Sequence, residues 1–145
     1  KCVDMTDETN AQCADTGDRG WYKILDHRKK VTAEPTLVNN IVYYPIYKPD
    51  NTTIGCGEGD ALICAVDADC GYNRSSELDE NKATAKKDCY KVGQGVLSKL
   101  VIFGNKLYAN ISGKTDEKKA KTDIVIINAI DSDDENLRSS WRENF

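Results

Sequence analysis

Six cysteines are the side chains of this 145-residue chain best suited to covalent or metal chemistry. They are Cys2, Cys13, Cys56, Cys64, Cys70 and Cys89. A zinc site would need closely spaced cysteine pairs or partnered histidines, but the nearest two cysteines are Cys64 and Cys70 and the only histidine is His27. We therefore expect three disulfides, which are typical of compartments outside the cytoplasm. The spacing does not fix the pairing, and the pairs that we expect are Cys2–Cys13, Cys70–Cys89 and Cys56–Cys64.

Two acidic loops carry the oxygen ligands that Ca²⁺ prefers. Asp67, Asp69 and Asn73 alternate with other residues, as in a loop that wraps around a hard cation. The last ligand position of an EF-hand register would be Leu78, which has no ligand atom. Residues 131–136 form a similar acidic run. We interpret both loops as polar turns, with calcium as the alternative, and expect no other cofactor.

The remaining polar residues do not favour catalysis. His27 lies beside three basic residues, 28–30, in a charged turn where a general base would be surrounded mainly by water. The carboxylates are scattered through loops, and no pair has a spacing that would fix both across a cleft. We expect a protein that is not an enzyme.

Aromatic side chains offer a binding surface instead. Tyr43 and Tyr47 share one face of a predicted strand and Tyr44 takes the other, so one set should be core and the other exposed. Core packing is the simpler interpretation. An exposed set, together with Trp141, would suit a protein partner or a sugar.

Length, charge and hydropathy narrow the class of protein. The chain is long enough for one domain with a single core. Twenty Lys and Arg against 24 Asp and Glu give a net charge of −4 without a basic face, which disfavours nucleic-acid binding. The longest apolar run, residues 124–127, is far shorter than the roughly 18 residues of a membrane span. No signal-peptide core opens the chain, so we expect a soluble protein that has been processed or trimmed.

Short runs of β-branched and aromatic residues predict an all-β fold. Asn39-Asn40 and Gly104-Asn105 each separate two such runs and tolerate the positive φ of a tight hairpin. Helical periodicity is weak, and residues 76–87 are interpreted as an exposed loop with at most one helical turn. The predicted strands cover residues 21–25, 36–38, 41–47, 61–66, 99–103, 106–111 and 123–130.

An internal repeat relates the two halves of the chain. When Val31 is set against Val96 without gaps, an offset of 65 brings together similar residues over two strands, including Tyr43 and Tyr108. Further matches upstream and downstream extend the repeat to four strands. On this basis Tyr22, Val38 and Val42 should take the places of Tyr90, Phe103 and Leu107.

The predicted fold is therefore two four-stranded antiparallel meanders stabilised by disulfides. Two such units cannot close a propeller ring, so the sheets would be propeller-blade-like or packed as a small sandwich. The apolar run 124–127 should be a strand buried on both faces. The expected regions are an N-terminal arm (1–19) and a β domain (20–145) of two repeats (20–69 and 89–133) with a polar loop (70–88).

The same segments resemble the C-terminal part of the PilY family, surface proteins associated with type IV pilus tips and pilus biogenesis. The resemblance is carried by Gly20-Trp21-Tyr22, by residues 31–35 and 41–44, and by the Cys56 loop that leads to residues 62–67. Residues 93–99 and 140–143 look like the end of such proteins. The adhesion domain of some members, the other blades and the family's calcium loop have no counterpart in this sequence.

The resemblance implies a β-propeller-like piece of a pilus tip complex. We expect an extracellular or cell-surface component of a type IV pilus or similar filament that contacts other subunits, or a second copy of itself, in assembly or adhesion. Unpaired sheet edges would make these contacts, because a partner that adds a strand covers them. The alternative is a secreted carbohydrate- or ligand-binding module that uses the tyrosine-rich face.

Overall fold

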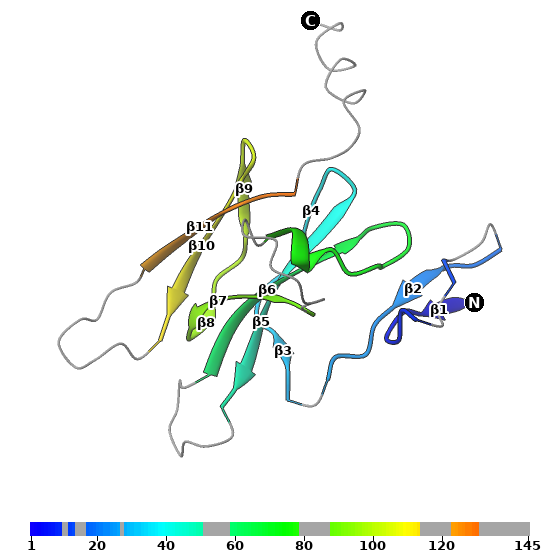
Figure 1. Ribbon diagram of the computed structural model, residues 1–145, viewed down its shortest axis with the longest axis horizontal. Helices are drawn as coiled ribbons and strands as arrows, with labels where there is room; N and C mark the ends of the chain where they lie inside the picture. The colour runs from blue at the N-terminus through cyan, green and yellow to red at the C-terminus, as the bar shows by residue number, and fades with distance from the viewer. Residues whose placement is uncertain are drawn as a thin grey trace, which may run out of the picture.

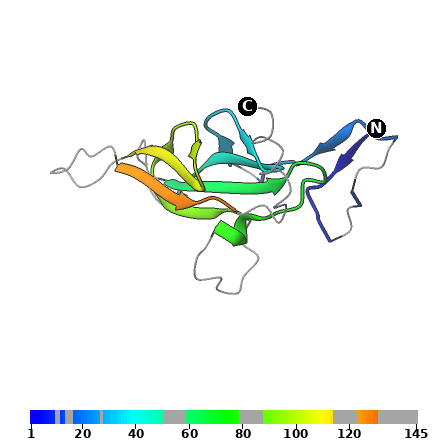
Figure 2. The same ribbon diagram turned by 90° about the horizontal axis from the view of Figure 1, so that it is seen from above.

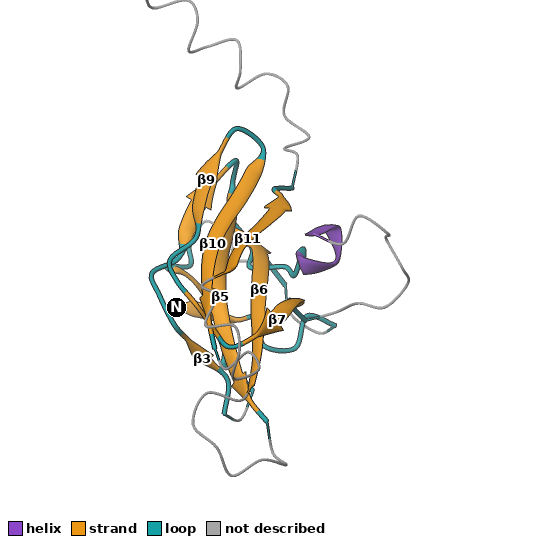
Figure 3. Ribbon diagram, turned by 90° about the vertical axis from the view of Figure 1, so that its left-hand side faces the viewer, coloured by secondary structure: helices purple, strands orange, loops and turns teal. Residues whose placement is uncertain are grey.

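The structure is a computed structural model, and it describes residues 1–9, 12–13, 17–26, 28–50, 59–78, 88–113 and 123–130. Figure 3 shows that strands dominate these residues, and the helical element is a single 3₁₀ turn, η1 (Ser75–Leu78). The described part of the chain contains no α-helix and no helix long and apolar enough to cross a membrane. The all-β class is therefore confirmed, and η1 lies where the sequence allowed one helical turn.

The first sheet is built on two long antiparallel strands, β5 (Ile41–Pro49) and β6 (Gly59–Asp67). Two short strands, β3 (Lys30–Val31) and β4 (Thr36–Val38), pair in series with the other edge of β5. On the far side, β7 (Tyr90–Gln94) pairs with β6. The long strands run through the centre of the molecule in Figure 1.

The second sheet has the same arrangement around β10 (Lys106–Ser112). Two short strands, β8 (Val96–Leu97) and β9 (Val101–Phe103), pair with one edge of β10, and β11 (Asp123–Asn128) pairs with the other. Within the described residues, no strand pairs with the outer edge of β11. The second sheet therefore lacks a counterpart of β7.

The hairpins β4–β5 and β9–β10 have the same register once the numbering is shifted by 65. Leu37 pairs with Val42 in the first, and Ile102 pairs with Leu107 in the second. The offset seen in the sequence therefore describes backbone pairing in these two hairpins.

The turns of both hairpins use left-handed backbone. Asn39 and Asn40 have φ of 51° and 60°, and Gly104 has φ of 62°. A two-residue turn of this kind needs residues that tolerate positive φ, which Asn and Gly do better than other residues. Both predicted hairpins are confirmed.

The prediction of two four-stranded meanders is not confirmed. In each sheet the two short strands share one edge of the central strand instead of forming successive neighbours. Nor does Tyr22 take the place of Tyr90: it lies in β2 (Gly20–Tyr22), which pairs in parallel with β1 (Cys2–Asp4) in a separate small sheet. The sheets formed by the described residues are not closed, and they form no propeller.

The two larger sheets share one hydrophobic core. The first sheet contributes one face of β5 and β6, including Ile41, Tyr43 and Ile63, and the second contributes the β10 side chains Leu107 and Ala109. All of these side chains are buried. Figure 2 shows the second sheet, yellow to orange, alongside the first, cyan to green. The positions of these core residues alternate along each strand, as expected for sheets with one face in the core.

Two disulfides are formed, and their pairing differs from the expected one. Cys64 bonds to Cys89, and Cys13 bonds to Cys70. Cys2 is free and exposed, which contradicts its predicted disulfide, and Cys56 lies outside the described residues. The register of β6 with β7 places Cys64 opposite Cys89, a long-range pairing that the sequence does not reveal.

Candidate functional site

The second sheet has an apolar face that points away from the shared core, and we call it the outer face. Every second side chain of β10 and β11 points to this side, together with the side chains of β8 and β9 that pair with them. Large apolar groups stay exposed there: 79% of Phe103, 65% of Ile124, 59% of Val101 and 53% of Ile126. The face also includes Val96, Tyr108, Lys106, Asn110, Ser112 and Asn128.

A continuous row crosses the middle of the outer face. Tyr108 on β10 is in register with Val101 on β9 and with Ile126 on β11. Directly opposed residues in antiparallel pairs lie on the same side, so these three side chains are neighbours. Lys106 is the one charged group among the described side chains of this face, and its Nζ lies 3.2 Å from Asn128 Oδ1. The row itself therefore contains no charged side chain.

The outer face contradicts the prediction that residues 124–127 form a strand buried on both sides. Val125 and Ile127 pack against the core, but Ile124 and Ile126 are exposed. The reason is that the described part of the chain provides no layer over this side of the sheet. Monomeric proteins seldom leave large contiguous apolar patches in water, so the outer face is a candidate protein interface.

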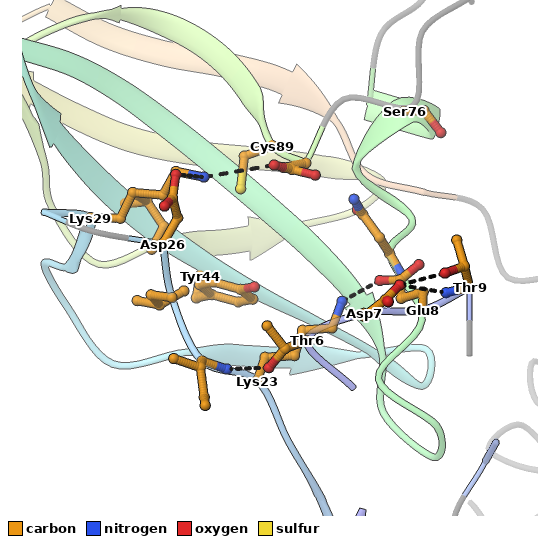
Figure 4. Close-up of a pocket in the computed structure, with 15 residues that line it drawn as sticks. Thr6, Asp7, Glu8, Thr9, Lys23, Asp26, Lys29, Tyr44, Ser76 and Cys89 are labelled. Carbon is orange, nitrogen blue, oxygen red and sulfur yellow. Dashed lines mark hydrogen bonds and ion pairs between the residues drawn. The ribbon is translucent and has the colours of Figure 1, made fainter. Parts of the chain in front are cut away.

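A second candidate site is a cavity of 670 Å³ on the opposite side of the first sheet. It lies between β5, the N-terminal arm and the segment that follows β2 (Figure 4). Tyr44 and Ile46 form its floor, and Thr6, Leu25 and Cys89 are among its walls. The cavity is large enough for a small molecule.

The charged groups of the cavity are largely paired with each other. Glu8 accepts hydrogen bonds from Lys23 Nζ and from the backbone N–H of Asn73. Lys29 Nζ lies 3.7 Å from a carboxylate oxygen of Asp26 and equally far from one of Asp88. The two lysines therefore do not make the cavity an anion site.

Tyr44 is the side chain of this cavity best placed to contact a ligand. Its ring lies on the cavity side of β5. Burial raises the pKa of the Tyr44 hydroxyl, and the nearby carboxylates of Glu8 and Asp88 raise it further. The phenol therefore stays neutral at physiological pH and offers both a donor and an acceptor.

Tyr43 and Tyr47, two other predicted partner-binding residues, do not join these sites. Tyr43 is 1% exposed, and its hydroxyl accepts a hydrogen bond of 3.0 Å from the backbone N–H of Ile130, which ties the two sheets together. Tyr47 is half-buried on β5, where its ring contacts Gly59. His27 and Trp141 lie outside the described residues.

The first acidic loop forms a hydrogen-bonded turn. Asp67 Oδ1 accepts from the backbone N–H groups of Asp69 and Cys70, and Asp69 Oδ2 accepts from Asn40 Nδ2. Asn73 Oδ1 accepts from the backbone N–H of Ser75. The described residues contain no group of three or more His, Cys, Asp or Glu side chains that could hold a metal ion. The second acidic loop, residues 131–136, is outside the described part of the chain.

Sequence reasoning missed the outer face, and the one predicted partner-binding residue that lines the cavity is Tyr44. The sequence does carry a signal of the outer face, because two strands have apolar side chains on both of their sides. Val101 and Phe103 alternate with Ile102, and Ile124 and Ile126 alternate with Val125. The cavity has no comparable signal, since it depends on how the N-terminal arm folds over β5.

The comparisons with known proteins do not assign either site. No protein-family model, no curated protein and no solved structure matches the chain.

Proposed function

We propose that this chain is a non-enzymatic, extracytoplasmic component of a type IV pilus or a similar surface filament. It acts through protein–protein contacts in assembly or adhesion, and the outer face of the second sheet is the contact surface. The observation that carries the proposal is the exposure of Val101, Phe103, Ile124 and Ile126 on one side of one sheet. Burying such side chains against a partner is favourable by about 25 cal/mol per Å² of apolar surface.

The two disulfides support the extracytoplasmic part of the proposal. Cys64–Cys89 and Cys13–Cys70 each join segments that are distant in the sequence, 25 and 57 residues apart. Such bonds persist in oxidising compartments and are rare where thiols are kept reduced.

The proposal also includes blade-like repeats in the two larger sheets. The shared register of β4–β5 and β9–β10 supports this, as does the position of the short strands at the same edge of β5 and β10. In this interpretation β7 is the fourth strand of the first unit, and the outer edge of β11 is the place for a fourth strand in the second.

Co-sedimentation with isolated filaments tests the function. The intact protein should pellet with purified pili from its source, and Ile126→Lys should weaken this binding by at least about tenfold because it places a charge in the apolar row. Leu37→Lys is the matched control, because Leu37 is 63% exposed but lies on the first sheet. Failure of the unmodified protein to pellet, or equal loss in both variants, would contradict the proposal.

The alternative is a secreted module that binds a carbohydrate or another small ligand in the cavity. The observation that favours it is the neutral Tyr44 phenol beside a cavity of 670 Å³ that also contains carboxylates, since aromatic rings and acceptor oxygens suit sugar hydroxyls. A glycan array probed with the intact protein tests this function. Binding that Tyr44→Ala abolishes, without any filament binding, would establish the alternative in place of the first proposal.

A further inference from the structure

The outer edge of β11 differs from the other edges of the two larger sheets in the described part of the chain. On one side, each sheet ends in two short strands of two or three residues. The first sheet ends on its other side in β7, which contains Lys91 and Gly93 and shifts in register against β6. Natural proteins protect sheet edges with such short strands, charges and irregularities.

β11 has none of these protections over most of its length. It pairs with β10 over six successive residues without a shift in register. Residues 124–128 include no charged residue, no proline and no glycine. A long, regular and uncharged edge is a template for an added strand.

Backbone groups of alternate β11 residues point toward this edge. Ala129 donates its backbone N–H to the carbonyl of Asn105 at 2.7 Å, so this pair is a hydrogen-bonded one. Such pairs recur at every second residue of an antiparallel ladder, which directs the backbone groups of Val125 to β10 as well. The N–H and C=O groups of Ile124 and Ile126 therefore point outward, where no described strand pairs.

The shared core is also less complete under β11 than under β6. Ile63 of β6 is 1% exposed, whereas Val125 and Ile127 of β11 pack against the same core and are only half-buried. In the first sheet, the next strand adds Tyr90 and Val92 to this core. A fourth strand at the edge of β11 would complete the second sheet in the same way.

We propose that a filament subunit adds an extended segment to the outer edge of β11 as the fourth strand of the second sheet. The inference rests on the proposed function and deepens it, because it states how the partner binds. The backbone of Ile124 and Ile126 forms hydrogen bonds with the segment. Their side chains lie on the outer face, so the edge and the outer face are one continuous surface that a single partner covers.

The neighbours of the added strand define its chemistry. On the core side it lies beside Val125 and Ile127, and on the opposite side it lies beside Ile124 and Ile126. Side chains of neighbouring strands pack against each other on each face of a sheet, so the segment carries apolar side chains on both sides. It has no proline where it pairs, because proline has no N–H to donate.

Two variants of Ile126 test strand addition by co-sedimentation with purified filaments. Ile126→Ala removes the side chain from the outer face but keeps the backbone N–H, and Ile126→Pro removes both. This N–H points away from β10, so proline costs no hydrogen bond between β10 and β11, and edge strands tolerate proline there. We expect Ile126→Pro to bind filaments about tenfold more weakly than Ile126→Ala, since a hydrogen bond to the partner is lost. Thermal unfolding checks that both variants fold.

Amide hydrogen exchange of the unmodified protein is the second measurement and does not depend on a variant. The amides of Ile124 and Ile126 should exchange at least about tenfold more slowly on the filament than in the isolated protein at low concentration. The amide of Val125, which faces β10, should be protected in both samples. Residue-level mass spectrometry measures all three.

The other outcomes overturn the inference. Equal binding of Ile126→Ala and Ile126→Pro, with unchanged exchange of the outward amides, would mean that no strand is added. If both variants still bind more weakly than the unmodified protein, the outer face remains the contact surface and the proposed function stands. Protection in the isolated protein would show that the chain covers its own edge, and protection that increases with protein concentration would show that a second copy does. An unmodified protein that does not pellet would contradict the proposed function and strand addition together.

Discussion

Tyr43 and Tyr108 occupy equivalent hairpin positions but have opposite surroundings. The first is buried between two sheets and accepts a hydrogen bond from the backbone N–H of Ile130, and the second is half-buried on the outer face of the second sheet. The local sequence is similar in both hairpins, so the difference comes from the next layer. A β-strand pattern fixes which side chains share a face, but only the neighbouring layer decides whether that face is buried.

The edges of the two sheets differ in the same way. In the first sheet, β7 covers the edge of β6, and Cys64–Cys89 links the two strands. In the second, the corresponding edge of β11 has no partner among the described strands. The edge of the first sheet is therefore covered and cross-linked, and the second sheet carries the proposed contact surface.

Of all the changes considered, Tyr43→Ala should cause the largest loss of folding stability. Removing a buried aromatic side chain costs about 3–5 kcal/mol, and the same change at the half-buried Tyr108 should cost less because its ring loses fewer contacts. Chemical denaturation should therefore show a larger loss for Tyr43→Ala than for Tyr108→Ala. Equal losses in the two variants would mean that Tyr108 is as deeply buried as Tyr43.

Removal of the Cys64–Cys89 bond should have the next largest effect. Loop-closure entropy for a separation of 25 residues gives about 3.5 kcal/mol as the stabilisation by this bond. The double variant Cys64→Ala and Cys89→Ala should lose up to this amount in a denaturant titration, and amide exchange should rise first in β6 and β7. Faster exchange in β10 and β11 alone would show that the bond does not stabilise the first sheet.

Ser75→Ala should destabilise the first sheet by about 1–3 kcal/mol, since it leaves buried polar groups without a partner. Ser75 is 1% exposed, and its Oγ accepts from the backbone N–H of Ala65 and donates to the carbonyl of Asp88 at 3.0 Å. These bonds tie η1 to β6 and to the start of β7. Ser76→Ala, an exposed neighbour, is the control for thermal unfolding, and an equal effect of both changes would remove this role.

Gly104→Ala should cost about 1 kcal/mol, because its φ of 62° is left-handed and open space surrounds the position. Gly104→Asn should be better tolerated, since Asn39 holds the equivalent position at φ of 51°. Thermal unfolding of both variants measures the difference. A larger loss for Asn than for Ala would show that the two hairpin turns are not equivalent.

The smallest effect concerns the ion pair between the sheets. A hydrogen bond from Lys99, together with its charge, holds the pKa of Glu34 below its ordinary value of 4.5. Any stabilisation from this group is present above pH 4.5 and is lost as the pH falls through the lowered pKa. Titration followed by NMR should show the pKa of Glu34 rising towards 4.5 in Lys99→Ala. An unchanged pKa would mean that the two equivalent positions do not meet.

Much of the strand pattern could be predicted from the sequence. The hairpin turns at Asn39-Asn40 and Gly104-Asn105 were predictable because few residues tolerate their backbone conformation. The parallel pairing of β1 with β2 and the Cys13–Cys70 bond were not, because both depend on contacts between segments that are remote in the chain.

The candidate sites were harder to predict for the same reason. The alternation of Ile124 and Ile126 with Val125 shows that these side chains point to opposite sides of a strand, but it does not show that one side lacks a covering layer. Tyr44 was recognised as part of an aromatic group. Its place in a cavity follows only from the fold of the arm over β5.

Hydroxyl-radical footprinting of the intact protein, alone at low concentration and bound to purified filaments, tests the central claim most directly. The account predicts that Phe103 and Ile126 are oxidised in the isolated protein and protected on the filament, while Tyr43 is protected in both. Equal oxidation of the outer face in the two samples, with protection elsewhere on the bound protein, would contradict the claim that this face is the contact surface.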